Sequence, residues 1–323
     1  MVQKLKEVDV VVIGVGMVGS IVAKELAASG LKVVGLERGN ARYTVPDFQG
    51  PAIHDELRFD IRKGLMQDNT REAVTFRNSR DQVALPIRRW ESFLPGTGLG
   101  GSMVHWNGQT YRFQANDFEL ATRTRERYGA RFLAPDIQIQ DWGVTYDDLE
   151  PLYWKSEQLM GVSGKAGNLR GQKIEGGNIF EAPRQHEYPT PPLKYSYISK
   201  MFEDAAKRLG YHPHPSPGAT ISQTYRNPDG VTRPGCEYCG HCQRFGCMIG
   251  AKAQPSNTLM PVLAKRSKFQ LHTGSWVRRV DHKDGRATGI RFMNNDGQEF
   301  FQPASIVVLA SFTLNNVRLL SLS

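Results

Sequence analysis

Three glycines between a short apolar run and a helical segment near the N-terminus constrain this chain most. Residues 8–13 (VDVVVI) are apolar and β-branched, which is typical of a buried parallel strand. Gly14, Gly16 and Gly19 follow in the spacing GxGxxG, and residues 17–29 then predict a helix. In such a unit the first glycine permits a tight turn, the second lets the backbone approach a pyrophosphate, and the third lets the helix pack on the strand. The helix N-terminus then offers N–H groups to the phosphates.

A second strand and an acidic residue complete this pattern. Residues 32–36 (KVVGL) predict a strand, and Glu37 at its end is placed to accept hydrogen bonds from a ribose. The β-α-β unit therefore predicts a Rossmann-like fold that binds a dinucleotide. The alternative is a glycine-rich turn that binds nothing, with Glu37 an ordinary surface acid. The motif alone does not separate FAD from NAD, although its position at the extreme N-terminus favours FAD.

The rest of the chain mixes helical and strand patterns, so we expect an α/β fold. Residues 145–160 and 195–209 predict amphipathic helices, and Thr145 is placed to cap the first. Strand patterns dominate the last part of the chain, at residues 269–281, 288–294, 298–302 and 305–310.

Residues 96–108 (GTGLGGSMVHWNG) form a second glycine-rich segment. Three of its glycines let the backbone come close to a flat or charged group: Gly98, Gly100 and Gly101. Polar side chains follow them, at Ser102, His105 and Asn107. We interpret this loop as a second part of a cofactor site.

All four cysteines lie between Cys236 and Cys247, so none remains elsewhere for a dispersed disulfide framework. Cys239 and Cys242 complete the spacing C-x2-C-x2-C-x4-C, which is close to the run that bacterial ferredoxins use. Short arcs of this kind direct several thiolates to one centre, so the segment predicts an iron–sulfur cluster. A structural zinc with four thiolates is the main alternative, and local disulfides or plain thiols are the others.

The formal net charge is +9, from 41 basic and 32 acidic side chains. The basic residues are scattered and form no stripe interleaved with aromatic side chains, so we expect a solvated surface and no nucleic-acid partner. No run reaches the roughly 18 to 20 apolar residues of a membrane span. Residues 1–29 have the outline of a signal peptide, but Asp9 and the three glycines inside the apolar run favour the nucleotide-binding interpretation.

Several segments together resemble one flavoprotein family. They are HDELRFDIRKGLMQ, TFRN, LPGTGLGGSMVHWNGQTYRF, YDDLEPLYWKSEQLMGVSGKAGN and CEYCGHCQRFGCMIGAKAQPSNTLMPVL. Over nearly its whole length the chain is similar to the glucose–methanol–choline (GMC) oxidoreductases. Within them it resembles the flavoprotein subunits of bacterial gluconate 2-dehydrogenases and of fructose, sorbitol and FAD-dependent glucose dehydrogenases. The run Glu37-Arg38-Gly39 is also similar to that of many flavoproteins.

The resemblance implies FAD as the cofactor, with the loop of residues 96–108 against the flavin. Gly100-Gly101 followed by His105-Trp106 is similar to the pyranose oxidase branch, in which the histidine is bonded covalently to the flavin methyl group. His105 is therefore a candidate attachment site, and a non-covalent flavin contact or a purely structural histidine are the alternatives. Further contacts to FAD are implied at Val277, for the adenine, and at Ala310 and Ser311, for the pyrophosphate side.

The family fold implies an FAD-binding domain made of residues 1–45, 96–115 and 230–323, which includes the cysteine segment 236–247. Residues 46–95 and 116–229 are expected to form an inserted, largely α+β region on the substrate side. The cysteine segment would hold a 3Fe-4S or a 4Fe-4S cluster.

The resemblance also implies an activity, the oxidation of a hydroxyl of a sugar, sugar acid or polyol. Electrons would pass through the cluster to a membrane cytochrome c subunit, and a small export subunit would carry the protein to the periplasmic face of the inner membrane; the cytoplasm is the alternative location. The catalytic histidine pair of the family has no counterpart before Ser323, so we expect the chain to be the N-terminal part of a longer enzyme. Alternatives are a sugar oxidase that uses oxygen, an NAD-dependent dehydrogenase, and an inactive flavin-binding or electron-transfer module.

Overall fold

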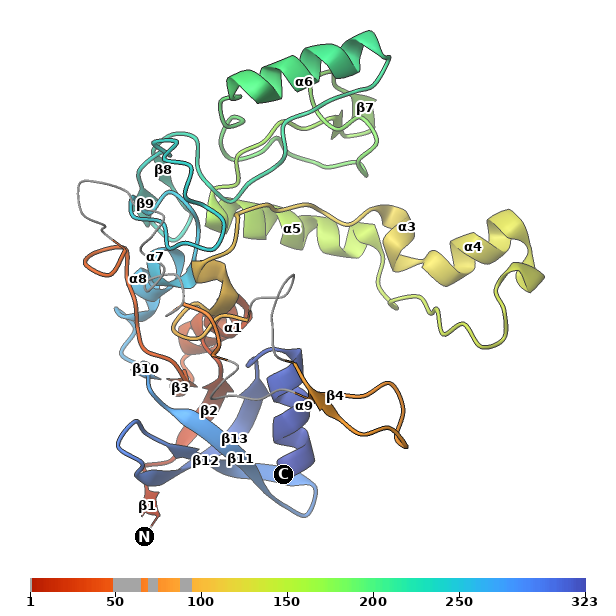
Figure 1. Ribbon diagram of the computed structural model, residues 1–323. Coiled ribbons are helices and arrows are strands. Elements are labelled where there is room, and N and C mark those ends of the chain that lie inside the picture. Colours follow the sequence, from red (N-terminus) through yellow and green to blue (C-terminus); the bar gives the residue numbers. More distant parts are fainter. Residues whose placement is uncertain (1, 49–64, 69–74, 88–94) are drawn as a thin grey trace. The chain divides into compact units, whose positions relative to one another are not determined.

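The computed structural model describes residues 2–48, 65–68, 75–87 and 95–323 (Figure 1). The chain divides into two compact units, Met1–Asn107 with Tyr238–Ser323, and Gly108–Glu237. Residues 46–95, which we expected on the substrate side, fall within the first unit, and most of that range lies outside the described residues. The division into an FAD-binding domain and a substrate-side region stays a prediction.

The first unit is built on a seven-stranded mixed sheet in the order β10-β3-β2-β13-β12-β11, with β1 beside β13. The strands are β1 (Gln3–Lys4), β2 (Val8–Ile13), β3 (Val33–Leu36), β10 (Phe269–His272), β11 (Trp276–Lys283), β12 (Arg286–Met293) and β13 (Glu299–Leu309). The pairs β10–β3, β3–β2 and β2–β13 are parallel, and β13–β12 and β12–β11 are antiparallel. The α/β fold predicted from the sequence is confirmed.

The strand β13 corrects one detail of the sequence analysis. We expected two strands, at residues 298–302 and 305–310, on either side of Pro303. The structure has one strand, since Pro303 lies where the pairing passes from one neighbour to the other: Pro303 is opposite Gly289 of β12, and Ala304 is opposite Val8 of β2. The run 269–281 is instead divided at Gly274, where φ is +60°, into β10 and β11.

Helices cover both faces of this sheet. The strand β2 alternates its side chains, so that Val10 and Val12 point to one face and Val11 and Ile13 to the other. The first face packs against α1 (Met17–Ala28) and α8 (Met260–Leu263), which follows α7 (Pro255–Thr258). On the other face, α9 (Thr313–Leu322) contributes Leu319 and contacts β11. The first unit also contains the short helix η1 (Gly101–Val104) and the hairpin of β4 (Thr75–Phe76) and β5 (Leu85–Pro86).

The second unit contains helices, short hairpins and long loops. Its described elements are α3 (Ala115–Phe118), α4 (Leu120–Tyr128), η2 (Ala130–Phe132), α5 (Tyr146–Met160), β6 (Asn168–Leu169), β7 (Gln172–Lys173), α6 (Tyr197–Arg208), β8 (Tyr225–Arg226) and β9 (Thr232–Arg233). The two helices predicted here are confirmed. Thr145 caps α5 as expected, because its hydroxyl accepts from Asp148 N at 3.3 Å while Asp148 Oδ2 accepts from Thr145 N at 2.8 Å.

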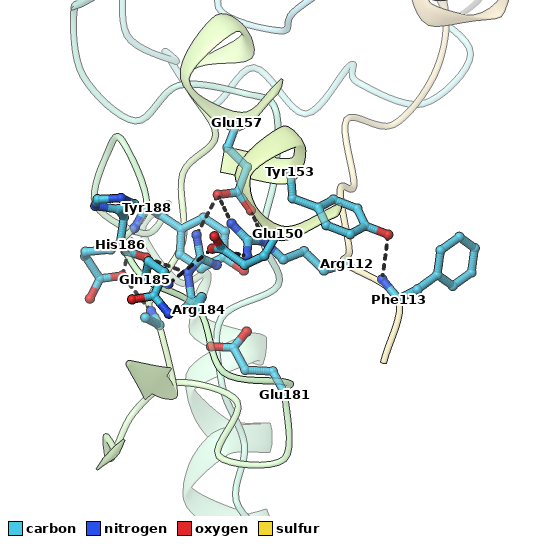
Figure 2. Close-up of polar contacts among 12 residues, drawn as sticks. Arg112, Phe113, Glu150, Tyr153, Glu157, Glu181, Arg184, Gln185, His186 and Tyr188 are labelled. Carbon is cyan, nitrogen blue, oxygen red and sulfur yellow. Dashed lines mark hydrogen bonds and ion pairs between the residues drawn. The ribbon is translucent and has the colours of Figure 1, made fainter. Parts of the chain in front are cut away.

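Four buried charged side chains hold the second unit together (Figure 2). Both carboxylate oxygens of Glu157 accept from Arg112, Oε1 from Nε at 2.8 Å and Oε2 from Nη2 at 2.9 Å. Arg184 Nη2 donates to Glu157 Oε2 at 2.6 Å, and Arg112 Nη1 donates to Glu150 Oε1 at 2.9 Å. Two guanidinium and two carboxylate groups balance in charge, which fixes α5 against the segments around it.

Among the helices that the structure describes, none combines the length and the apolar character of a membrane span.

Candidate functional site

A cavity of about 410 Å³ opens in the first unit at the carboxyl ends of β2, β3 and β13. This volume is in the range of small-molecule and cofactor sites, about 300 to 1,000 Å³. Residues from the glycine turn, from η1 and from the start of β11 complete its wall. The predicted cofactor residues that line it are Gly14, Gly16, Glu37, Gly100, Gly101, Ser102, Val277, Ala310 and Ser311.

The glycine turn after β2 is closed in a way that only glycine permits. Gly14 has φ +89°, and a Cβ there would lie 2.7 Å from the carbonyl oxygen of Ala310. Helix α1 then begins with Gly16 as its N-cap, without a side-chain cap and without an acidic residue in its first turn. The first N–H groups of a 12-residue helix therefore face a cavity with no side-chain acceptor of their own, which suits an anionic group such as a pyrophosphate.

Gly19 has a structural place in this turn. It does not line the cavity; instead the helix rests on the turn there, since an added Cβ would lie 2.0 Å from the carbonyl oxygen of Gly14. This is the packing role expected of the third glycine in the motif.

Glu37 ends β3 beside the cavity and is almost buried, with 8% of its surface exposed. Its two oxygens accept from the backbone N–H groups of Val15 and Gly39, each at 3.0 Å. Burial raises the pKa of Glu37, and these backbone donors oppose the shift. Each carboxylate oxygen has a second lone pair, so the group ties the glycine turn to β3 and still has acceptors for a ribose.

The two glycine-rich motifs meet through their backbones. Gly100 N donates to Val15 O at 3.0 Å, and Gly100 pairs with Gly16 in an isolated parallel bridge. Gly100 has φ +101°, a conformation that side chains rarely adopt. Ser102 Oγ accepts from Gly96 N at 2.9 Å, which closes the loop. The loop therefore forms one wall of the same cavity as the turn after β2.

His105 lies directly after η1, with 4% of its surface exposed. Its Nε2 has no hydrogen-bond partner among the described residues. Burial, together with the charge of Lys252, lowers the pKa of His105 to about 4. The imidazole is therefore neutral at neutral pH. Neither His105 nor Asn107 belongs to the described wall of the cavity, although Ser102 and Met103 do.

The far wall of the cavity includes residues that sequence reasoning did not single out. Trp276 and Ser275 come from the start of β11, beside the predicted Val277, and Arg38 follows Glu37. Asn316 of α9 also lines the wall, and its Oδ1 accepts from Ser311 N at 3.0 Å and from Ser311 Oγ at 2.8 Å. The sequence could have indicated Arg38, Ser275 and Trp276 only because each lies within two residues of a predicted position. None of the cavity's described wall residues is a histidine, so no catalytic base is assigned.

The four cysteines are partly buried thiols, and none forms a disulfide. Their donor chemistry suits a thiolate-bound iron or zinc centre. In the arrangement seen here, however, no three His, Cys, Asp or Glu side chains of the described chain converge closely enough to hold a metal ion. The side chain of Lys252, which has no exposed surface, reaches this segment and donates to Cys242 O at 2.6 Å.

The charged cluster of the second unit is not a competing site. The cavity beside Arg112 has a volume of about 50 Å³, which is far too small for a sugar or a cofactor. The four charges already neutralise one another through hydrogen bonds of ordinary length (Figure 2). This arrangement stabilises the unit and leaves no charge available for chemistry.

Comparisons with known proteins agree with this geometry. The family model of the GMC oxidoreductases matches residues 138–323, more than half of the chain. The chain is 40% identical to the gluconate 2-dehydrogenase flavoprotein of Pantoea cypripedii, over 99% of this chain and 53% of that protein. It is 27% identical to the fructose dehydrogenase large subunit of Gluconobacter japonicus, over 98% of this chain and 54% of that protein. The chain thus spans about half the length of these curated relatives.

A solved structure shares the fold. A formate oxidase variant of Aspergillus oryzae superposes with a TM-score of 0.53 at 16% identity, over 98% of this chain and 48% of that one. The glycine turn, the second glycine loop and the family model all indicate the same protein family. The chain belongs to the GMC oxidoreductases.

Proposed function

We propose that this chain is the FAD-binding part of a dehydrogenase that oxidises a hydroxyl of a sugar acid, with gluconate as the first substrate to test. The observation that carries the proposal is the 410 Å³ cavity whose wall unites both glycine motifs, Glu37 and the ends of β11 and β13. The 40% identity to a gluconate 2-dehydrogenase flavoprotein supports the substrate class.

The residues of this chain have separate tasks in that proposal. The N–H groups at the start of α1 bind the pyrophosphate, and Gly16 leaves room for it because the nearest atom to an added Cβ is 3.9 Å away. Glu37 accepts from the ribose, and the backbone around Val277 meets the adenine. Bound FAD supplies the hydride acceptor for the carbon that carries the hydroxyl. None of the described residues that line the cavity is assigned as the general base for the hydroxyl proton.

His105 is the candidate flavin attachment site, although it lies outside the described wall of the cavity. Its Nε2 is neutral and has no partner among the described residues, so its lone pair is available to bond a flavin methyl group. We propose covalent attachment there. Acid precipitation of the protein tests this, because FAD bound through His105 stays with the pellet and His105→Ala releases it to the supernatant.

The cysteine segment is the second part of the proposal. Its thiols would hold an iron–sulfur cluster, with four thiolates for the 4Fe-4S type and three for the 3Fe-4S type, and such a cluster would supply one-electron transfer toward a cytochrome subunit. The spacing of the cysteines and the donor chemistry support this part. A small export subunit and a location on the periplasmic face of the inner membrane belong to the same proposal, and cell fractionation with the partner co-expressed tests them.

One preparation separates the candidates. The protein is purified without oxygen, and its absorption spectrum, iron and acid-labile sulfide are measured before and after gluconate is added. The dehydrogenase proposal expects flavin bands, iron with sulfide, and bleaching of the flavin by gluconate. Oxygen consumption with sugar and no iron would favour the oxidase alternative, and a colourless protein would favour an NAD enzyme. Flavin that no sugar or sugar acid reduces would leave only an inactive flavin-binding module.

A further inference from the structure

Two side chains of the cavity wall, Trp276 and Arg318, have no task in the proposed chemistry. They come from different elements, Trp276 from the start of β11 and Arg318 from α9. The Cζ atom of Arg318 lies 5.6 Å from the centroid of the Trp276 ring, and a cation is attracted to an aromatic face within about 6 Å. Two flat groups, an indole and a guanidinium, therefore meet in the wall of this cavity.

The start of β11 holds Trp276 beside the end of β3. Ser275 N donates to Glu37 O at 2.9 Å, and Gly274 N donates to Gly39 O at 3.1 Å. The residue before Trp276 is thus bonded to the backbone of Glu37, whose carboxylate is proposed to bind the ribose. The base of a nucleotide is bonded directly to its ribose, so a ribose at Glu37 brings the base to this part of the wall.

Helix α9 is anchored on both sides of Arg318. Before it, Asn316 Oδ1 accepts from Ser311 N at 3.0 Å. After it, Ser323 Oγ accepts from Val280 N of β11 at 2.9 Å. The backbone that carries Arg318 is therefore fixed relative to β11, and both Arg318 and Trp276 are half-buried. Side chains that are already held in place lose little further freedom when a ligand binds, which favours affinity.

The chemistry of this pair suits a nucleobase. Bases stack on aromatic rings and on the planes of arginine guanidinium groups, and each such stack contributes about 1 to 3 kcal/mol to binding. The other task open to Arg318 is an ion pair with the diphosphate of the same ligand. That ion pair would be indifferent to the base, whereas stacking depends on the size of its rings.

We propose that Trp276 and Arg318 together form the platform on which the adenine base of the cofactor stacks. This inference rests on the proposed function, because it takes the ligand of the cavity to be FAD. It adds a side-chain surface to the backbone contact expected around Val277, which follows Trp276 directly. The platform also gives the cavity a preference for a purine, since two fused rings cover more of it than the single ring of a pyrimidine.

Two nucleotides separate stacking from an ion pair. ADP and UDP carry the same ribose and the same diphosphate and differ in the base. The full chain, prepared without FAD, is titrated with each nucleotide by calorimetry, and FAD is titrated in parallel. The variants are Arg318→Met, which removes both the charge and the plane, Arg318→Lys, which keeps the charge, and Trp276→Leu, which removes the ring.

Arg278 provides the matched control. Its Cζ lies 4.7 Å from the centroid of the same Trp276 ring, but the residue is exposed and does not belong to the described wall of the cavity. Arg278→Met therefore removes a guanidinium from the same tryptophan without changing the proposed platform. Its dissociation constants for FAD, ADP and UDP should stay within about twofold of wild type.

The platform predicts that wild-type protein binds ADP more tightly than UDP. In Arg318→Met, Arg318→Lys and Trp276→Leu the dissociation constants of ADP and FAD should rise at least fivefold. UDP should lose less, so that the preference for ADP over UDP falls at least threefold. A merely structural role would weaken both nucleotides equally and leave this preference unchanged. If Trp276→Leu does not fold, the two Arg318 variants decide the question.

Equal losses for ADP and UDP in the Arg318 variants would overturn the proposal and assign Arg318 to the diphosphate or to the fold. Wild-type affinity for ADP in those variants, or a wild-type protein without preference between ADP and UDP, would overturn it as well. Wild-type protein that binds neither FAD nor ADP would instead contradict the proposed function itself.

Discussion

Alanine at Gly16 should weaken ligand binding and alanine at Gly19 should weaken the fold, although the two glycines belong to one motif. At Gly16 an added Cβ has Gly100 O at 3.9 Å as its nearest neighbour, and φ is −76°, so the folded chain can accommodate the methyl group. At Gly19 the Cβ would lie 2.0 Å from Gly14 O, a backbone atom that must move. Gly16→Ala should therefore damage ligand binding alone, and Gly19→Ala should damage the fold.

The magnitudes follow from these distances. For Gly16→Ala, a poorer N-cap costs about 0.5 to 1 kcal/mol, and the lower entropy of the unfolded chain offsets about the same amount, so the free energy of unfolding should change by less than about 0.5 kcal/mol. A methyl group in the pyrophosphate space costs about 1 to 3 kcal/mol of binding, or about 5- to 150-fold in the dissociation constant of FAD. For Gly19→Ala, overpacking costs about 1 to 3 kcal/mol and the better helix propensity of alanine returns about 1 kcal/mol. Because the clash is with backbone, we expect a net loss near 1 to 2 kcal/mol.

The assay uses protein prepared without FAD. Urea denaturation followed by circular dichroism gives the free energy of unfolding, and quenching of flavin fluorescence gives the dissociation constant of FAD. Gly16→Ala that binds FAD as wild type does would refute the pyrophosphate assignment of the turn. Gly19→Ala with wild-type stability would refute the packing of α1 on the turn.

Three further predictions concern buried charges. Burial lowers the pKa of His105 from 6.5 to about 4, so the unfolded chain binds more protons than the folded chain between these two pH values. The free energy of unfolding should therefore fall by about 3 kcal/mol as the pH drops from 6.5 to 4. In His105→Gln, urea denaturation at several pH values should show a flatter dependence of this free energy on pH. Glu157→Gln should destabilise the second unit by about 3 to 5 kcal/mol, because Arg184 keeps its buried charge without this partner. The control Glu126→Gln, at an exposed ion pair, should change stability by less than about 1 kcal/mol. Equal effects of the two substitutions on thermal unfolding would contradict the role of the charged cluster. Glu37→Gln replaces one carboxylate oxygen, which accepts from Val15 N or from Gly39 N, with an amide nitrogen that cannot accept, and it should weaken FAD binding about tenfold. Unchanged affinity by titration would remove Glu37 from the ribose site.

Much of the candidate site was predictable because its signals are local. Gly14, Gly16 and Gly19 follow a strand and open a helix, and this order alone specifies the turn and its anion-binding face. Parallel strands place their carboxyl ends at one edge of a sheet, which explains why Glu37 and Ala310, the latter implied by the family resemblance, line one cavity. The cap of α5 was equally local, since Thr145 and its partner are three residues apart.

The remaining features depend on contacts between segments that are far apart in sequence. No local pattern brings Gly100 onto Gly16, or places a buried lysine at Lys252 under the backbone of Trp106. Nor does a sequence pattern show that Pro303 lies at the junction of two pairing modes rather than at a strand end. These depend on the tertiary fold, in which a residue's neighbours outweigh its own propensity.

The long strand β13 has a consequence for how the first unit loses its structure. Its first half bonds the antiparallel ribbon and its second half bonds the nucleotide-binding strands, so one continuous strand belongs to both halves of the sheet. The hairpin of β11 and β12 and the cofactor cavity should therefore melt as one cooperative block. A change in that hairpin would reach the cavity both through the shared strand β13 and through the start of β11, which itself lines the wall.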